Sequence, residues 1–366
     1  MHEIFQHGEK IQEEAKILGK KSIFTIGTTT KKTPNGLPFT TPIRAYKSAV
    51  IGGCIVYTQL QAEQVARALD GKVDYILADC EKKIDYSIGE PTDATQHLRS
   101  VGNVELGNIS SVCFDVVSRS KIVEYKPNDI TVNAVWQFIS NYFDSSFSTL
   151  NAAIIGVGNI GFKLALKLVE SGVETSLYRR NEAKGRALEN TINMIKPTST
   201  VARATYFDQP LHACLFRKIL IGCSSGEPCI AMDMVSSMAK NGLILDVGKG
   251  TLQAGVADYA LEQGIQVIRA DVAWGLESLV AEVCVDKGKF AIGRKTLKSG
   301  IGLVSGGYYG KRYDLVVDNY DDPKYFYGVA DGKGDFLKTG EKEIDSLLNT
   351  AKTEINLRNF DVIAQV

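Results

Sequence analysis

A glycine-rich turn between two apolar runs constrains this 366-residue chain more than any other feature. Residues 152–155 lead into Gly156, Gly158 and Gly161, spaced as Gly-x-Gly-x-x-Gly, and a helical pattern and a second strand at 174–178 follow. The first glycine permits the tight turn, the second lets the backbone approach a pyrophosphate, and the third lets the helix pack closely on the strand. This arrangement predicts a dinucleotide site at a helix N-terminus, whereas a glycine turn in another α/β unit is the alternative. The residues expected at the pyrophosphate are Gly156, Gly158, Asn159, Ile160 and Gly161.

The end of the second strand indicates which dinucleotide would bind. An NAD site usually has an acidic residue there, about 20 residues after the glycines, to hold the ribose 2′-hydroxyl. Here the chain reads Tyr178, Arg179, Arg180 and Asn181, with two guanidinium groups and no carboxylate. Because arginine binds phosphate oxygens through two parallel N–H groups, the segment favours NADP, with NAD possible. The alternative is that both arginines open the next helix in solvent.

The composition excludes several classes of protein. The formal net charge is zero, which gives no electrostatic reason to expect nucleic acid or a membrane surface as a partner. The N-terminus is too polar for a signal peptide and no apolar run is long enough to span a membrane, so we expect a cytoplasmic protein. The seven cysteines and four histidines form no close ligand pairs, so neither a disulfide framework nor a metal site is expected. A homodimer is expected only because symmetric dimers are the commonest oligomers.

Strand and helix patterns alternate along most of the chain. Apolar, β-branched runs at residues 22–27, 49–57, 73–78 and 108–117 predict strands of a first domain. Apolar residues at helical spacing predict a helix over residues 130–143 that bridges to the second domain.

The chain from the glycine turn to residue 270 alternates strictly between strands and helices. Such alternation predicts a Rossmann-type doubly wound parallel sheet with right-handed crossovers. We therefore expect an α/β fold in which residues 131–286 form the dinucleotide-binding domain and residues 1–130 form a second α/β domain for the substrate. The glycine-punctuated residues 287–366 are expected to return to the first domain.

Two further strands of the second domain end in small or polar residues. Ligands of such sheets bind at the carboxyl ends of the strands. Residues after the strands at 218–222 and 243–247 should therefore flank the same crevice as the glycine turn. These residues are Cys223, Ser224, Ser225, Gly248 and Lys249.

The order of these parts resembles the two-domain NAD(P)-dependent amino-acid-dehydrogenase-like family, which includes shikimate dehydrogenase and methylene-tetrahydrofolate dehydrogenase. The matching segments are GVGNIG at 156–161, YRRN at 178–181, ILIGCSSG at 219–226 and LILDVGKG at 243–250. The resemblance covers roughly residues 128–270 and implies a nicotinamide-binding domain. It implies no particular substrate, because the first third of the chain lacks the substrate signatures of either enzyme.

Hydride transfer to a carbonyl or imine needs a proton donor and a group that polarises the acceptor. In the resembling family a lysine, sometimes with an aspartate, has this role. Candidates here are Asp79 and Lys82 at the end of a predicted buried strand, Asp129 at the start of the bridging helix, and Lys249 between two glycines. The alternatives are that Lys82 belongs to a solvated loop, that Asp129 only caps its helix and that Lys249 is an exposed turn residue.

A basic segment indicates the charge of the substrate. Residues 20–47 carry six cationic side chains, no acidic one and a run of threonines at 28–30, a pattern suited to an anion or simply a solvated loop. The sequence therefore predicts an oxidoreductase that transfers a hydride between NADP(H) and a small polar, anionic carbonyl or imine metabolite. Two alternatives remain: a lyase or hydrolase that uses tightly bound NAD transiently, and a non-enzymatic dinucleotide sensor.

Overall fold

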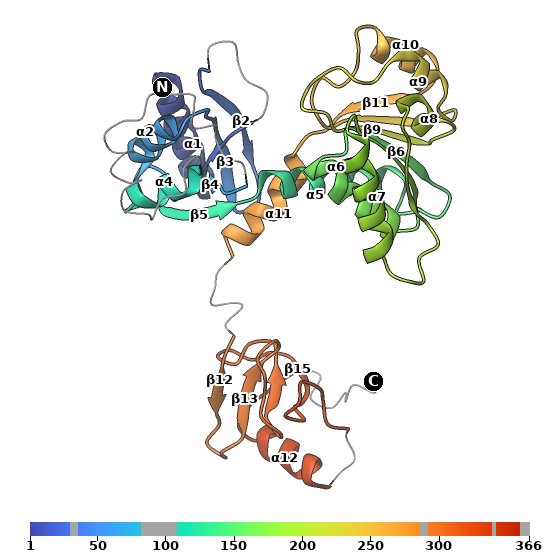
Figure 1. Ribbon diagram of the computed structural model, residues 1–366. Coiled ribbons are helices and arrows are strands. Elements are labelled where there is room, and N and C mark those ends of the chain that lie inside the picture. Colours follow the sequence, from blue (N-terminus) through green and yellow to red (C-terminus); the bar gives the residue numbers. More distant parts are fainter. Residues whose placement is uncertain (30–35, 82–107, 286–291, 339–341, 359–366) are drawn as a thin grey trace. The chain divides into compact units, whose positions relative to one another are not determined.

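The computed structural model describes residues 1–29, 36–81, 108–285, 292–338 and 342–358 (Figure 1). The chain divides into two compact units, Met1–Cys284 and Val285–Val366. Among the described residues, the first unit contains two sheets, of five and six strands, and the second contains one sheet of four.

The first sheet has the strand order β2-β3-β1-β4-β5. Neighbouring strands are parallel except β2 and β3, which are antiparallel. Helices α1, α2 and α4 pack against one face of this sheet, around buried side chains such as Phe24 and Ile76. The elements are α1 (His2–Leu18), β1 (Lys21–Gly27), β2 (Phe39–Ala45), β3 (Ala49–Ile55), α2 (Gln59–Leu69), β4 (Tyr75–Asp79), α4 (Ile109–Val116) and β5 (Lys121–Tyr125).

The predicted strand at residues 108–117 is wrong, because this segment forms α4. Asn108 caps the helix and accepts a hydrogen bond from the Ser110 backbone N–H at 3.1 Å. The buried residues Ile109, Val112 and Cys113 are three and four positions apart, which is helical spacing. Over so short a run, a helix and a fully buried strand have nearly the same apolar pattern.

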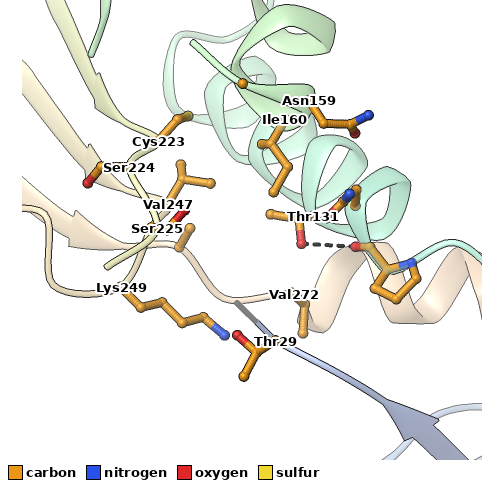
Figure 2. A pocket seen from close by; sticks show the side chains of 15 residues that line it. Thr29, Thr131, Asn159, Ile160, Cys223, Ser224, Ser225, Val247, Lys249 and Val272 are labelled. Atoms are coloured by element: carbon orange, nitrogen blue, oxygen red, sulfur yellow. Dashed lines mark hydrogen bonds between the residues drawn. The ribbon is translucent and has the colours of Figure 1, made fainter. Parts of the chain in front are cut away.

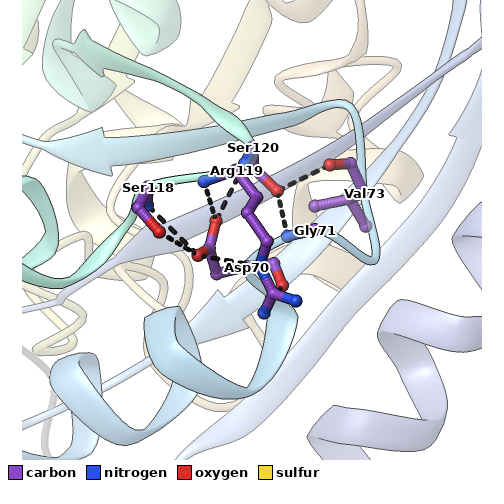
Figure 3. A network of polar contacts seen from close by, with 6 residues as sticks. All are labelled: Asp70, Gly71, Val73, Ser118, Arg119 and Ser120. Carbon is purple, nitrogen blue, oxygen red and sulfur yellow. Dashed lines mark hydrogen bonds and ion pairs between the residues drawn. The ribbon is translucent and has the colours of Figure 1, made fainter.

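Asp70 joins the end of α2 to the loop before β5 (Figure 3). Its carboxylate accepts hydrogen bonds from the backbone N–H groups of Ser118, Arg119 and Ser120, at 3.1, 2.8 and 2.8 Å. Burial alone would raise the pKa of Asp70, but these donors hold that pKa well below its usual range. The ionised side chain therefore fixes the loop that leads into β5.

The second sheet has the strand order β11-β10-β9-β6-β7-β8, with every neighbouring pair parallel. Numbered from β6, this is the order 3-2-1-4-5-6 of a doubly wound dinucleotide-binding sheet. The predicted Rossmann-type α/β fold is thereby confirmed. The strands are β6 (Asn151–Ile155), β7 (Glu174–Tyr178), β8 (Ala204–Tyr206), β9 (Ile219–Gly222), β10 (Leu243–Asp246) and β11 (Gln266–Arg269).

Helices cover both faces of this second sheet. On one face α5, α6 and α7 contribute to a core that includes Ile154 and Leu177, and on the other α8, α9 and α10 pack around Ile155 and Leu220. The strands are consequently apolar on both sides, as expected of a buried parallel sheet. The helices are α5 (Pro127–Tyr142), α6 (Asn159–Glu170), α7 (Glu182–Ile195), α8 (Pro210–Cys214), α9 (Met232–Ser236) and α10 (Val256–Glu262).

The chain crosses between the two sheets twice, along α5 and again along α11 (Ala273–Val283), and these two helices pack together (Figure 1). The apolar side of α11 packs on the second face of the first sheet, where Leu279 and Val280 join Ile23 and Leu77. Residues assigned from the sequence to the dinucleotide-binding domain therefore complete the core of the first sheet. The predicted domain division as a whole stays a prediction.

Residues of the second unit form a sheet of their own, in the order β12-β13-β14-β15. Its core combines Leu303, Leu315 and Phe326 from the strands with Ile344 and Leu348 from α12. The elements are β12 (Arg294–Thr296), β13 (Gly302–Ser305), β14 (Leu315–Val317), β15 (Phe326–Val329) and α12 (Lys342–Lys352). The expected return of residues 287–366 to the first domain stays a prediction.

The described residues contain neither a membrane-spanning helix nor a cluster of metal ligands. No helix there combines the length and the apolarity that a membrane span requires. Within the same ranges, no group of three or more His, Cys, Asp or Glu side chains is placed to hold a metal ion.

Candidate dinucleotide and substrate site

The glycine turn between β6 and α6 leaves an open space at the N-terminus of the helix. Gly156 has a φ of 89°, and a Cβ there would lie 2.7 Å from the Ser224 backbone nitrogen, so only glycine fits. Gly158 is the N-cap of α6, and a Cβ there would have its nearest neighbour 4.0 Å away. A Cβ at Gly161 would lie 3.3 Å from Ile154, consistent with close packing of helix on strand. The turn therefore has the three features that let a backbone hold a pyrophosphate.

Two cavities meet at this turn, along the carboxyl ends of the strands. The outer cavity has a volume of about 590 Å³ and the inner cavity about 340 Å³. Both are lined by Gly158, Cys223, Ser224 and Ser225, so they adjoin each other at these residues, and the two together are called the groove. Burial raises the pKa of the Cys223 thiol, which disfavours a role for it as a thiolate nucleophile.

Most of the residues predicted to bind the cofactor line this groove. Gly161 is the exception, since it contributes to the packing of α6. The lining residues from that prediction are Gly156, Gly158, Asn159, Ile160, Arg179, Arg180, Asn181, Cys223, Ser224, Ser225 and Gly248.

The outer cavity gathers three cations and one carboxylate. Arg179, Arg180 and Lys184 line it from the end of β7 and the start of α7, and Glu227 lines it from the loop after β9. Arg179 is half-buried and donates to the Val157 carbonyl oxygen at 2.6 Å, whereas Arg180 is exposed and lies 3.3 Å from Glu227. The cations are where a Rossmann sheet holds the adenosine ribose of its cofactor.

Asn181 has a structural role beside these cations. Its side chain caps α7 by accepting a hydrogen bond from the Lys184 backbone N–H at 2.9 Å. The cap starts the helix at Glu182 and so fixes the position of Lys184 in its first turn. This explains why an amide, which suits an N-cap, follows the two arginines.

The inner cavity is small and has both polar and apolar lining residues, and the ammonium group of Lys249 extends into it (Figure 2). Lys249 extends from the loop after β10 toward Thr29, which follows β1 of the first sheet. Asn128 and Thr131 of α5 line the same space, and the Thr131 hydroxyl donates to the Pro127 carbonyl oxygen at 3.0 Å. Both sheets of the first unit therefore contribute to this cavity.

A buried carboxylate shapes the loop that carries Lys249. Asp246 accepts hydrogen bonds from the Gly250 N–H at 2.7 Å, the Thr251 hydroxyl at 2.8 Å and the Thr251 N–H at 3.2 Å. Lys249 itself has a φ of 61°, in the left-handed region that residues other than glycine seldom adopt. Asp246 is thus a positioning residue, because its hydrogen bonds hold the backbone that turns Lys249 toward the cavity.

Asp79, a predicted catalytic residue, is completely buried at the end of β4. Its carboxylate accepts from the Thr28 N–H at 3.3 Å and from the Glu81 N–H at 2.9 Å. The bond from Thr28 joins the end of β1 to the end of β4, and Thr28 precedes the cavity residue Thr29. Lys82, the other candidate of this segment, lies outside the described residues.

Asp129, the candidate at the start of α5, pairs with a lysine that the sequence analysis did not single out. Lys163 of α6 donates to Asp129 and lies 3.4 Å from the Glu81 carboxylate. Partial burial disfavours the charged form of Lys163 and would lower its pKa, but these carboxylates raise the pKa above its ordinary value. The end of β4 therefore lies beside the helix that follows the glycine turn.

Four groups near the groove escaped the sequence analysis: Thr131, Lys163, Lys184 and Glu227. Lys184 and Lys163 have a detectable signal, since each lies within the first two turns of a helix that opens at a predicted ligand site. Glu227 has none, because it reaches Arg180 from 47 residues along the chain.

Comparison with known proteins gives only distant similarity. No protein-family model and no curated protein sequence matches the chain. Among solved structures it is similar to L-tryptophan dehydrogenase from Nostoc punctiforme, with 14% identity, a TM-score of 0.39, and coverage of 64% of this chain and 61% of that one. This chain thus spans less than two thirds of the length of that dehydrogenase.

Two further structures show the same level of similarity. Ornithine carbamoyltransferase from Gloeobacter violaceus has 12% identity and a TM-score of 0.38, covering 77% of this chain and 94% of that one. The NAD-complexed D-isomer specific 2-hydroxyacid dehydrogenase from Lactobacillus delbrueckii ssp. bulgaricus has 13% identity and a TM-score of 0.31, covering 60% and 72%. Similarities this weak carry no argument about function, which rests on the geometry of the groove.

Proposed function

We propose that the protein is an oxidoreductase that transfers a hydride between NADP(H) and a small, anionic carbonyl or imine compound. The observation that carries the proposal is the groove, because its two adjoining cavities place the three cations, the glycine turn and the Lys249 ammonium along one edge of the sheet. The proposal includes a cytoplasmic homodimer, as expected from the sequence.

The groove fits a dinucleotide at three points. The glycine N-cap of α6 leaves room for a pyrophosphate at the helix N-terminus, where backbone N–H groups favour an anion. Arg179, Arg180 and Lys184 would hold the 2′-phosphate through charge-assisted hydrogen bonds. The other end of the cofactor would reach the inner cavity, where the bound cofactor supplies or accepts the hydride.

The inner cavity sets the size and charge of the substrate. Its volume of about 340 Å³ suits a small molecule beside the nicotinamide. The Lys249 ammonium would bind an anionic group or donate a proton to the carbonyl oxygen, and the hydroxyl and amide groups of Thr29 and Asn128 would orient the substrate. Asp79 and Asp129 would act indirectly, by holding the backbone and the helices around the cavity.

A turnover screen tests the proposal. Purified protein is assayed for its bound nucleotide, and small oxo acids and imino acids are then screened for NADPH oxidation. We expect at least one substrate, and we expect Lys249→Met to abolish turnover while NADPH affinity stays unchanged. Lys240→Met is the matched control, because Lys240 is an exposed lysine of the same domain.

Other outcomes would favour the alternatives. NAD retained through purification, without net oxidation of added NADPH, would support a lyase or hydrolase. Binding of the dinucleotide with no turnover in any assay would support a sensor. Full activity of the Lys249→Met variant would contradict the role given to Lys249.

A further inference from the structure

We propose that Glu227 is a specificity-determining residue, which opposes the 2′-phosphate of NADPH and keeps NADH able to bind. The inference rests on the proposed function, since it concerns the cofactor of the same groove. It adds a carboxylate from a distant loop to the cations that follow β7.

Glu227 and Arg180 come from different loops at the outer cavity. Arg180 follows β7, Glu227 follows β9, and both line the cavity that also contains Arg179 and Lys184. The Glu227 carboxylate lies 3.3 Å from the Arg180 guanidinium. The acidic residue that an NAD site usually carries at the end of its second strand is thus supplied here from the loop after β9.

The loop that carries Glu227 is fixed by hydrogen bonds on both sides. The Ser224 hydroxyl donates to the Glu227 carbonyl oxygen at 2.7 Å, and the Cys229 N–H donates to the Thr251 carbonyl oxygen at 2.7 Å. The backbone at Glu227 is therefore held beside the cavity, while its side chain can still turn.

The exposure of the ion pair argues against a role in stability. The side chains of Arg180 and Glu227 are 85% and 69% exposed, and such surface pairs contribute little to folding. Solvent can replace either partner, so an incoming ligand can break the pair at little cost. The pair is therefore available for exchange when a cofactor binds.

The two cofactors would use this pair differently. The 2′-phosphate of NADPH needs Arg180 and is repelled by the nearby carboxylate, so it must displace Glu227. The 2′-hydroxyl of NADH can donate a hydrogen bond to Glu227, so the ion pair need not break. Arg179 is already bound to the Val157 carbonyl oxygen, which leaves Arg180 as the more adaptable cation.

Isothermal titration calorimetry of the full chain tests the inference. The affinities for NADPH and for NADH are measured for the wild type and for the Glu227→Gln and Glu182→Gln variants. Glu182 is the matched control, because its carboxylate pairs with Arg186 at 2.8 Å and it is not among the described residues that line the cavity. We expect Glu227→Gln to raise the preference for NADPH over NADH by about fivefold, the effect of one exposed charge interaction. The Glu182→Gln variant should keep the wild-type preference.

The other possible results distinguish a failure of the role of Glu227 from a failure of the proposed function. An unchanged preference in Glu227→Gln, or an equal change in Glu182→Gln, would overturn the role of Glu227 while the proposed function stands. Wild type that binds neither nucleotide would overturn both. A thermal melt of each variant confirms that the exposed substitutions leave the fold intact.

Discussion

Lys163, in the second turn of α6, forms an ion pair with Asp129 in the first turn of α5. The same ammonium lies 3.4 Å from Glu81, just beyond β4. One lysine thus connects the helix of the glycine turn to two elements beside the inner cavity. Asp129 is therefore a partner of Lys163, and its predicted catalytic role stays a prediction.

A double-mutant cycle measures this ion pair. We expect Asp129→Asn and Lys163→Met each to lower the free energy of unfolding at pH 7 by about 1 kcal/mol, and the double variant to lose less than the sum. Because the pKa of Lys163 is raised on folding, its contribution is fully present below the ordinary lysine pKa of 10.5 and is lost as the pH rises above the folded value. Urea unfolding provides the measurement, and strictly additive losses would contradict the pairing.

Substitutions of two glycines in the turn distinguish an effect on cofactor binding from an effect on stability. Gly158→Ala should fold with a free energy of unfolding within about 0.5 kcal/mol of wild type, because the added Cβ meets nothing closer than 4.0 Å. It should still weaken NADPH binding by about tenfold or more, since the methyl group occupies the approach of the pyrophosphate.

The companion variant Gly156→Ala should lose about 1–3 kcal/mol of stability, because its φ of 89° and the nearby Ser224 nitrogen exclude a side chain. Urea unfolding and NADPH titration of both variants give the comparison. Unchanged NADPH affinity in Gly158→Ala would show that no pyrophosphate approaches this backbone.

The ionisation of Asp70 makes the free energy of unfolding depend on pH in the acid range. Asp70→Asn should lower the free energy of unfolding at pH 7 by about 2–3 kcal/mol, because three backbone N–H groups lose a charged acceptor. The carboxyl pKa is lowered on folding, so its contribution is present above the ordinary value of 3.8 and is lost as the pH falls below it. The stabilities of variant and wild type should converge in acid.

The exposed Asp115 of α4 provides the control for this measurement. Asp115→Asn should change the free energy of unfolding by less than about 0.5 kcal/mol at any pH. A constant difference between Asp70→Asn and wild type from pH 7 to pH 2 would contradict the assignment of the acid sensitivity to Asp70.

The parts of the fold and site that could be predicted are those encoded within a short stretch of sequence. The Gly156–Gly161 spacing and the two arginines after the next strand both lie within one βαβ unit, so one window contains the whole pattern. Helix α4 could not be distinguished from a fully buried strand, because a run of only eight apolar-rich residues is compatible with both. The contacts of Glu227 and Lys163 depend on tertiary structure, which brings together residues 47 and 34 positions apart.

The affinities of single alanine variants for NADPH and NADH test most directly whether Arg179 and Arg180 bind the 2′-phosphate of NADPH. Arg180→Ala should weaken NADPH binding by about 1.5–3 kcal/mol, or 10- to 150-fold, and change NADH binding by no more than about twofold. Arg179→Ala should weaken both, because that guanidinium also binds the Val157 carbonyl oxygen in the glycine turn. Equal losses for NADPH and NADH in Arg180→Ala would contradict binding of the 2′-phosphate by Arg180.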